Sequence, residues 1–368
     1  MNENEILGFD PTQLEVFNQD DAPKSNFNSN IYKPKPSETK SEDGHYYATI
    51  KVIYNPFDLK RSVLEQQSYG LQDSEGWFTV VSSLTVNDTS CPIFKAWKKC
   101  HFAEPGTDLW KQAASKEDGG NQLFDKRFAR YVTIQVLSDK NHPELEGKYM
   151  FWKMPKSIWD IINAKMNPSK ESGKVAVPVM DFLFGRSIDL EVVPGPKDPK
   201  APEREARETK YMGELSEDVV SCTNPDGSPL LNDAEQLVLD TYVSAMKEVW
   251  RTKDPSERAQ KLTEVNSDPN TKELRQIYGK VLENIKKFCP DLIAELSYKE
   301  WDNATKERVQ KWIDIVLAGN NPRTDNAANT QVLNTVDTKP AETTASSVEV
   351  TSDPIGITSG DSSDDLPF

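Results

Sequence analysis

The sequence predicts an α+β protein: an OB-fold-like β-barrel core with inserted helical segments, then a small helical domain, with disordered tails at both ends. Three observations predict this class. Five segments rich in β-branched and aromatic residues occur between residues 45 and 193. Three amphipathic stripes follow between residues 233 and 317. Both ends of the chain are polar and lack periodicity, as disordered segments do.

The five predicted strands differ in the strength of their pattern. In the first, Tyr46, Ala48, Ile50, Val52 and Tyr54 alternate with their neighbours, as a half-buried strand should. The others are Trp77–Val81, Arg130–Leu137, Lys148–Met154 and Ser187–Val193. Five strands with irregular insertions suit a small Greek-key barrel of the OB type, although the count would also fit a sandwich.

Helical periodicity predicts three longer helices and two short ones. The longer helices are expected at Asp233–Arg251, Lys272–Cys289 and Thr305–Leu317, each with one apolar stripe that we interpret as core. The short ones are expected from Pro92 to Cys100 and from Pro155 to Ile162, where proline can occupy the first turn.

These elements divide the chain into four expected parts. Residues 1–44 form a mostly disordered arm, 45–200 the OB-like core, 201–317 the helical domain, and 318–368 a disordered acidic tail. The hydrophobic content of 36% is low for a fully packed chain of 368 residues, which agrees with unpacked tails.

Charge and motifs exclude several classes of protein. The net charge is −15, yet residues 91–174 hold 15 Lys and Arg against 10 Asp and Glu, so a mildly basic centre lies between acidic ends. No phosphate-binding glycine loop, zinc-protease motif or nucleophile elbow occurs, so we do not expect an enzyme. No stretch suits a signal peptide or a membrane span. Four widely spaced cysteines favour a reducing, cytoplasmic location.

A block from Phe124 to Tyr131 interleaves cations with aromatic residues. Lys and Arg neutralise phosphates, and aromatic faces stack on unpaired bases without reading sequence. The block therefore favours single-stranded nucleic acid. On a strand, Arg130, Val132 and Ile134 share one face, which we expect to point inward. Tyr131, Thr133 and Gln135 would then point outward, with Tyr131 as a stacking platform. Further candidates in the basic centre are Lys95, Trp97, Lys98, Lys99, Trp110, Lys148, Tyr149, Trp152 and Lys153.

A turn and the helix after it resemble a known family. Pro143-Glu144-Leu145-Glu146-Gly147-Lys148, a short aromatic strand, and Ile158-Trp159-Asp160 closely resemble the helix-destabilising single-stranded-DNA-binding protein of T-even phages and its relatives. The Tyr46–Pro56 strand, the Trp77 strand and Ser90-Cys91-Pro92 also fit, so the resemblance covers roughly residues 45–195. It implies an OB-fold with an inserted subdomain, DNA backbone contacts from the basic segment before the third strand, and base stacking beside it. By position, it points to Lys126, Arg127, Arg130 and Tyr131.

The sequence departs from that family in two places. The family protein binds structural zinc through one His and three Cys, but here only Cys91 matches, while Phe94 and a position near Ser82 replace cysteines. Cys100 and His101 lie nearby but do not complete a tetrahedral set. We expect no zinc and no other cofactor. The family also self-associates on DNA through a basic arm, whereas this N-terminus is acidic up to Asp21. We therefore do not expect self-association through a basic arm, and self-association on DNA would need another mechanism.

The last five residues, Asp364-Asp365-Leu366-Pro367-Phe368, resemble the acidic tip of bacterial single-stranded-DNA-binding proteins. In those proteins the tip docks replication and repair proteins, since a Phe and a terminal carboxylate suit a small pocket with a basic rim. The resemblance implies recruitment of partners such as polymerase, helicase or recombinase.

Together these patterns predict a phage protein that coats and protects single-stranded DNA during replication, recombination and repair, in the cytoplasm of the host. Two alternatives remain. A single-stranded RNA-binding protein would carry similar stacking residues, because only 2′-hydroxyl contacts separate the two. A replisome scaffold or loader would depend on the helical domain at 232–317 instead, with DNA contacts secondary. Site size, cooperativity and oligomeric state do not follow from the sequence.

Overall fold

The computed structural model describes residues 16–17, 30–169, 174, 176–195, 209–252 and 254–323. Its strands are β1 (Val16–Phe17), β2 (Ile31–Tyr32), β3 (Tyr46–Ile53), β4 (Val63–Asp73), β5 (Gly76–Val81), β6 (Asp125–Asp139), β7 (Tyr149–Lys153), β8 (Ile188–Pro194) and β9 (Thr209–Leu215). Its α-helices are α1 (Pro92–His101), α2 (Asp108–Ala113), α3 (Lys156–Met166), α4 (Asp233–Arg251), α5 (Pro255–Ser267), α6 (Pro269–Lys286), α7 (Leu292–Leu296) and α8 (Asn303–Leu317).

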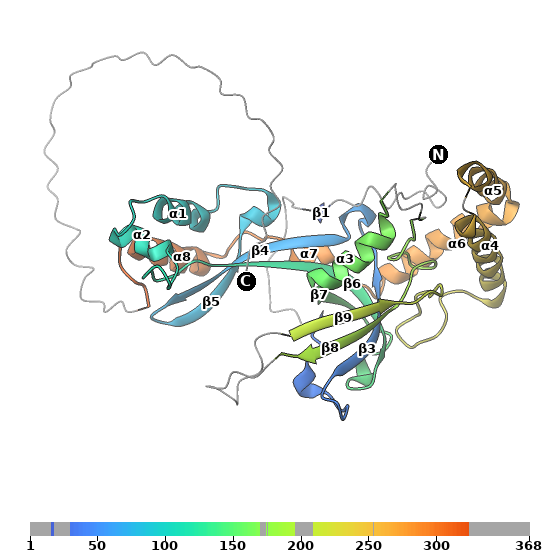
Figure 1. The fold of residues 1–368 in the computed structure, drawn as a ribbon, viewed down its shortest axis with the longest axis horizontal. Helices are drawn as coiled ribbons and strands as arrows, with labels where there is room; N and C mark the ends of the chain where they lie inside the picture. The colour runs from blue at the N-terminus through green and yellow to red at the C-terminus, as the bar shows by residue number, and fades with distance from the viewer. Residues whose placement is uncertain are drawn as a thin grey trace, which may run out of the picture. The chain divides into compact units, whose positions relative to one another are not determined.

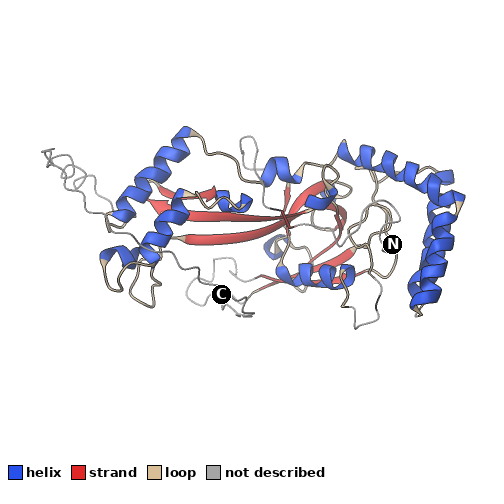
Figure 2. Ribbon diagram, turned by 90° about the horizontal axis from the view of Figure 1, so that it is seen from above, coloured by secondary structure: helices blue, strands red, loops and turns tan. Residues whose placement is uncertain are grey.

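All the described strands belong to one sheet, with β6 at its centre (Figures 1 and 2). Its main path runs β1-β4-β6-β3-β8-β9, while β5 pairs with β4, β7 with β6, and β2 with β7. Among the described residues, no pairing joins the two end strands of this path into a closed ring. The mixture of sheet and helices agrees with the predicted α+β class, whereas a closed OB-type barrel is not established.

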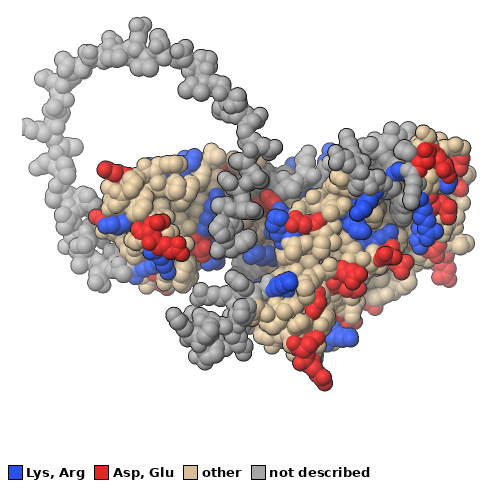
Figure 3. Space-filling model, viewed as in Figure 1, with Lys and Arg blue, Asp and Glu red and all other residues tan. Residues whose placement is uncertain are grey.

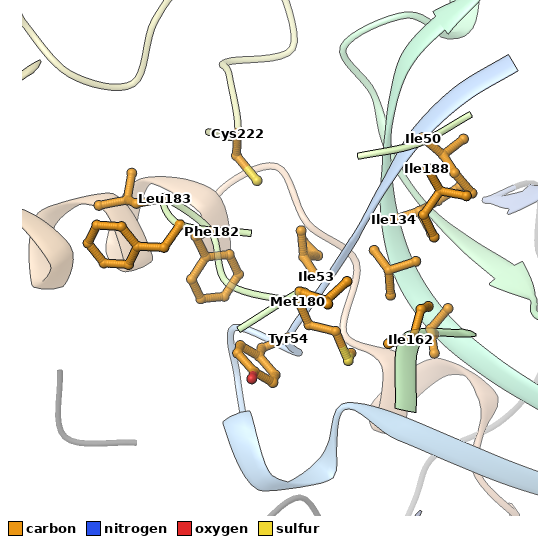
Figure 4. Close-up of a cluster of buried hydrophobic side chains, with 14 of the residues drawn as sticks. Ile50, Ile53, Tyr54, Ile134, Ile162, Met180, Phe182, Leu183, Ile188 and Cys222 are labelled. Atoms are coloured by element: carbon orange, nitrogen blue, oxygen red, sulfur yellow. The ribbon is translucent and has the colours of Figure 1, made fainter. Parts of the chain in front are cut away.

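The first core lies on one part of this sheet. It joins side chains of β3, β6 and β8 to α3 and to the segment from Val179 to Phe184, as Figure 4 shows for Ile50, Ile134, Ile188, Ile162 and Met180. Ile50, Ile134 and Ile188 point to one side of the sheet, where α3 packs its apolar face against them. Helices α4 and α6 pack on the same core through Leu239, Val249, Leu274 and Ile285.

A second core forms where β4, β5 and the beginning of β6 extend beyond the first. Tyr69, Leu71 and Val80 of the sheet pack there against α1 and α8. The Trp312 indole of α8 donates to the Gln72 carbonyl at 3.0 Å. Arg308 binds both carboxylate oxygens of Asp73 at 2.7 and 2.9 Å, which lowers the pKa of Asp73 and raises that of Arg308. These contacts fix α8 on the far end of the sheet.

The structure differs from the expected domain boundaries at two places. Residues 30–44 were expected in a mostly disordered arm, yet β2 pairs with β7, and buried Tyr32 donates to Asp139 at 2.8 Å. The expected boundary at residue 201 is crossed by β9, which pairs along its length with β8. The polar composition of both segments gave no sign of structure. Their order depends on contacts with other parts of the chain, such as the hydrogen bond from Tyr32 to Asp139 and the pairing of β9 with β8. Helix α8 packs on α1, so the late helices are also not a separate body.

The predicted disordered tail begins at residue 318, yet its first residues are ordered: the Gly319 carbonyl accepts from Gln112 at 2.8 Å, and Arg323 donates to the Asn121 carbonyl at 3.3 Å. The rest of the predicted tail, with the tip Asp364–Phe368, lies outside the described residues. No helix in the described part of the chain is both long enough and apolar enough to cross a membrane.

Candidate nucleic-acid interface

The long strand β6 connects the two cores and is uncovered on one side between them. Lys126, Phe128 and Arg130 lie on the same side of β6 as Val132 and Ile134, which are fully buried in the first core. Phe128 is 61% exposed, and Lys126 is also exposed, whereas Arg130 is only partly so. We refer to Lys126, Phe128 and Arg130 as the exposed strip. It presents one aromatic ring between two cations.

The side chains of the exposed strip contact one another and the neighbouring elements. The Lys126 ammonium lies 4.8 Å from the centre of the Phe128 ring, and partial desolvation lowers its pKa. The Arg130 guanidinium forms an ion pair with Glu65 of β4 and lies 5.3 Å from the centre of the Trp159 ring on α3. These contacts position the cations while leaving the Phe128 ring open to a ligand.

The opposite side of β6 is less open. Arg127 lies there and donates from Nε to Asp125 at 2.8 Å. Its guanidinium covers Gly70, where an added Cβ would lie 2.6 Å from Arg127 Nη2. Tyr131 is partly covered by α7 through Leu292, Ile293 and Leu296, and burial raises its pKa. Arg127 and Tyr131 therefore do not share a surface with the exposed strip.

The predicted outward face of β6 is wrong for two residues. Thr133 and Gln135 are fully buried. The Gln135 amide donates to the carbonyls of Gly147 and Thr223 at 3.0 and 2.8 Å, and its oxygen accepts from the Thr223 amide at 3.1 Å. The loop around Thr223 covers this side of the strand, so simple alternation could not reveal it.

Two of the predicted stacking residues are also core residues. Trp152 is 1% exposed and packs in the first core, and Tyr149 is buried there and donates to the Thr223 carbonyl at 2.7 Å. Burial raises the pKa of Tyr149 far above its usual value. Neither ring can offer a face to a base, so both predictions are wrong. The flanking Lys148 and Lys153 are exposed, and their contact with phosphates stays a prediction.

The remaining predicted cations, Lys98 and Lys99, lie on α1 and not on the sheet. Both are exposed on the helix that covers the second core. In Figure 3, Lys and Arg atoms gather in the middle of the view, where Figure 1 shows β4 and β6 running between α8 and α3.

Sequence reasoning missed two members of this surface, Phe128 and Trp159. Phe128 was inside the predicted basic and aromatic block, and its spacing of two from Lys126 and Arg130 is the signal that places all three on one side of a strand. In the sequence, Trp159 stands out only as part of the Ile158-Trp159-Asp160 motif. Its position beside Arg130 depends on the packing of α3, which no local pattern encodes.

The described residues do not fit the zinc site that the family resemblance implies. Cys91 accepts a hydrogen bond from Ser82 Oγ at 3.2 Å, and Cys100 is buried with a pKa raised by desolvation to about 11. His101 instead stacks on Trp97 at the surface. Within the described ranges, no group of three His, Cys, Asp or Glu side chains could hold a metal ion. The absence of zinc from the protein stays a prediction.

Comparison with known proteins supports the family resemblance. No protein-family model matches the chain. The "Single-stranded DNA-binding protein" of Enterobacteria phage T2 is 27% identical over 150 residues, which is 40% of this chain and 46% of that protein. The protein of the same name from Enterobacteria phage T4 is 25% identical over 150 residues, with the same shares. The predicted resemblance to this phage family is confirmed, and the match spans a little under half the length of these curated relatives.

Proposed function

We propose that the protein binds single-stranded DNA without strong sequence preference, with the exposed strip of β6 as the centre of its binding surface. The observation that carries this proposal is the 61% exposed Phe128 ring between Lys126 and Arg130. An exposed aromatic face can stack on an unpaired base, and the adjacent cations can neutralise the flanking phosphates. The names of the two phage relatives support the same ligand.

Stacking makes the surface selective for single strands. Bases in a duplex are already stacked on their neighbours, so they offer no free face to Phe128. Binding the melted state then shifts the equilibrium between duplex and single strands by mass action, and no catalysis is required. We further propose that the sheet is an OB-type fold whose strands present the nucleic acid, as this fold often does.

In this account the protein coats and protects single strands during phage DNA replication, recombination and repair. Recruitment of partner proteins is assigned to the tip Asp364–Phe368, which lies outside the described residues. Removing Leu366–Phe368 should leave DNA affinity unchanged and abolish the capture of replication proteins.

A competition experiment tests the proposed ligand. Fluorescent oligo-dT bound to the wild-type chain is displaced with unlabelled single-stranded DNA, duplex DNA or single-stranded RNA of the same length. We expect displacement by single-stranded DNA well below the concentrations of duplex or RNA that are needed. Equal displacement by RNA would favour the RNA-binding alternative. An absence of oligo-dT binding would reject the proposal and direct attention to a scaffold role.

A further inference from the structure

Helix α1 carries a ladder of aromatic rings on its surface. The Phe94 and Trp97 rings lie 5.8 Å apart at 11°, and Trp97 and His101 lie 4.7 Å apart at 16°. The Phe102 ring then meets His101 edge-on at 5.0 Å. The spacing of three and four residues places the first three rings on one side of the helix. We refer to Phe94, Trp97, His101 and Phe102 as the α1 ladder.

The α1 ladder is fixed at its base and open at its top. Phe94 and Trp97 are partly buried against the second core, beside Ile93, Ala96 and Cys100, which are fully buried. His101 is exposed, and Phe102 is 75% exposed, the highest value among the large apolar side chains of the described residues. The open end of the α1 ladder is therefore accessible to a ligand.

The charge around the α1 ladder favours a polyanion. The helix Pro92–His101 contains Lys95, Lys98 and Lys99 and no Asp or Glu. All three lysines are exposed, and the Lys98 ammonium lies 4.6 Å from the centre of the Phe94 ring. The open Phe102 ring can stack on an unpaired base, and the lysines of the preceding turns can neutralise the flanking phosphates.

The second core links the α1 ladder to the exposed strip. Cys91, the residue before α1, is in the second core together with Tyr69 of β4. Tyr69 pairs directly with Lys126 in the sheet. Tyr69 and Cys91 are both buried, so a strand of nucleic acid that leaves the exposed strip at Lys126 passes over the second core before it meets the rings of α1.

We propose that the α1 ladder is a second stacking subsite for the same DNA strand that occupies the exposed strip. This inference rests on the proposed function, since it extends the path of that ligand. Because the two surfaces lie on different elements, a short oligonucleotide fills the exposed strip alone, and a longer one fills both. The higher affinity of the longer oligonucleotide is then due to its contact with the α1 ladder.

A length series tests this subsite. Binding of oligo-dT from about 4 to 16 nucleotides, the range of known OB-fold site sizes, is measured by fluorescence anisotropy. The variant His101→Ala/Phe102→Ala removes two exposed rings, and Trp97→Ala removes the central one. A matched control, Lys287→Ala/Phe288→Ala, removes a cation and a 44% exposed ring at the end of α6. Circular dichroism checks that each variant is folded.

We expect the His101→Ala/Phe102→Ala variant to bind the shortest oligonucleotides like wild type and the longest ones roughly 5- to 150-fold more weakly. Trp97→Ala, if folded, should show the same loss of affinity for the longest oligonucleotides. The control variant should bind every length with wild-type affinity. Wild-type affinity of the His101→Ala/Phe102→Ala variant for all lengths would overturn the subsite. So would an equal loss at every length, because the rings would then belong to the primary site. A wild-type chain that binds no oligo-dT would instead reject the proposed function.

Discussion

The two halves of β6 share one strand and one alternation, yet they have opposite environments. From Val132 to Val136 every side chain is buried, including the polar Thr133 and Gln135. From Asp125 to Arg130 every side chain is exposed or partly so. The first half extends past the helices and loops that cover the second. A strand that is longer than its cover presents a regular, rigid surface, and this is where the exposed strip lies.

The comparison teaches that residue type does not identify the binding surface. Trp152 and Phe128 are both aromatic and both lie beside cations in the sequence. Trp152 lies within the covered part of the sheet and stabilises it, whereas Phe128 lies outside the cover and is open to a ligand. Stability and binding should therefore separate cleanly between the two halves, and each of the following changes tests that separation.

The largest effect is expected on stability. Trp152→Ala should lower the free energy of unfolding by about 3–5 kcal/mol, because it opens a cavity in the first core. Phe128→Ala should change it by less than about 0.5 kcal/mol, as for other exposed positions. Urea unfolding followed by far-ultraviolet circular dichroism measures both. Similar losses in the two variants would contradict the contrast between the covered and the uncovered part of the sheet.

The next effect concerns the stacking ring itself. Phe128→Ala should weaken oligo-dT binding by about 1–3 kcal/mol, since it removes one base-stacking platform. The dependence of affinity on salt should stay the same, because no charge changes. Anisotropy titrations at several salt concentrations give both quantities. Unchanged affinity in this variant would place the bases elsewhere on the protein.

Charge changes should distinguish the two sides of β6. Lys126→Ala removes a cation of the exposed strip and should reduce the slope of log affinity against log salt by about 0.7, the value for one phosphate contact on a single strand. Arg127→Ala, on the opposite side and paired with Asp125 at 2.8 Å, should change the slope less. The same titrations provide the comparison. A larger change for Arg127 would mean that the strand follows the other side of the sheet.

The smallest effect is a pH dependence where residues 30–44 meet the turn after β6. His142 lies 3.1 Å from Glu38 and 3.2 Å from Glu144. Partial burial opposes the charged form, but the hydrogen bonds to Glu38 and Glu144 outweigh it and raise the pKa of His142 above 6.5. The Lys35 and His142 side chains lower the pKa of Glu38 below 4.5.

A raised histidine pKa stabilises the fold below about pH 6.5, and a lowered carboxylate pKa stabilises it above about pH 4.5. His142→Ala should thus cost most between these values, by less than about 1 kcal/mol for a surface pair, and the loss should shrink as the pH rises through the folded pKa of His142. Thermal unfolding from pH 5 to 9 measures the difference. A loss that does not vary with pH would show that His142 acts only by packing.

Local patterns predicted the elements that carry their own periodicity. The strands β3, β7 and β8 and the helices α4, α6 and α8 occur close to their expected positions. Strand β4 escaped because Glu65, Gln66, Gln67 and Ser68 interrupt its apolar pattern as it passes between the two cores. This part of the sheet is not covered by other elements, which makes it a candidate surface. For the same reason its strand lacks the alternating apolar residues by which a strand is predicted.

The sequence predicts the residue types of the candidate site, but it does not predict which side of β6 is exposed. Lys126 and Arg130 could be found from the basic and aromatic block. That Tyr131 is covered by α7, and Gln135 by the loop at Thr223, depends on contacts between residues far apart in the chain. Only tertiary packing decides such coverage, so the sequence could not separate the open ring from the buried ones.

The central claim, that the uncovered half of β6 holds the bases, is tested most directly by photo-crosslinking. The wild-type chain is bound to oligo-dT that contains 5-iododeoxyuridine, irradiated and analysed by mass spectrometry at residue resolution. The account predicts a nucleotide adduct on Phe128 and none on Tyr149 or Trp152. Adducts on Tyr149 or Trp152 with Phe128 unmodified would contradict it, because the bases would then reach a part of the sheet that is covered in this fold.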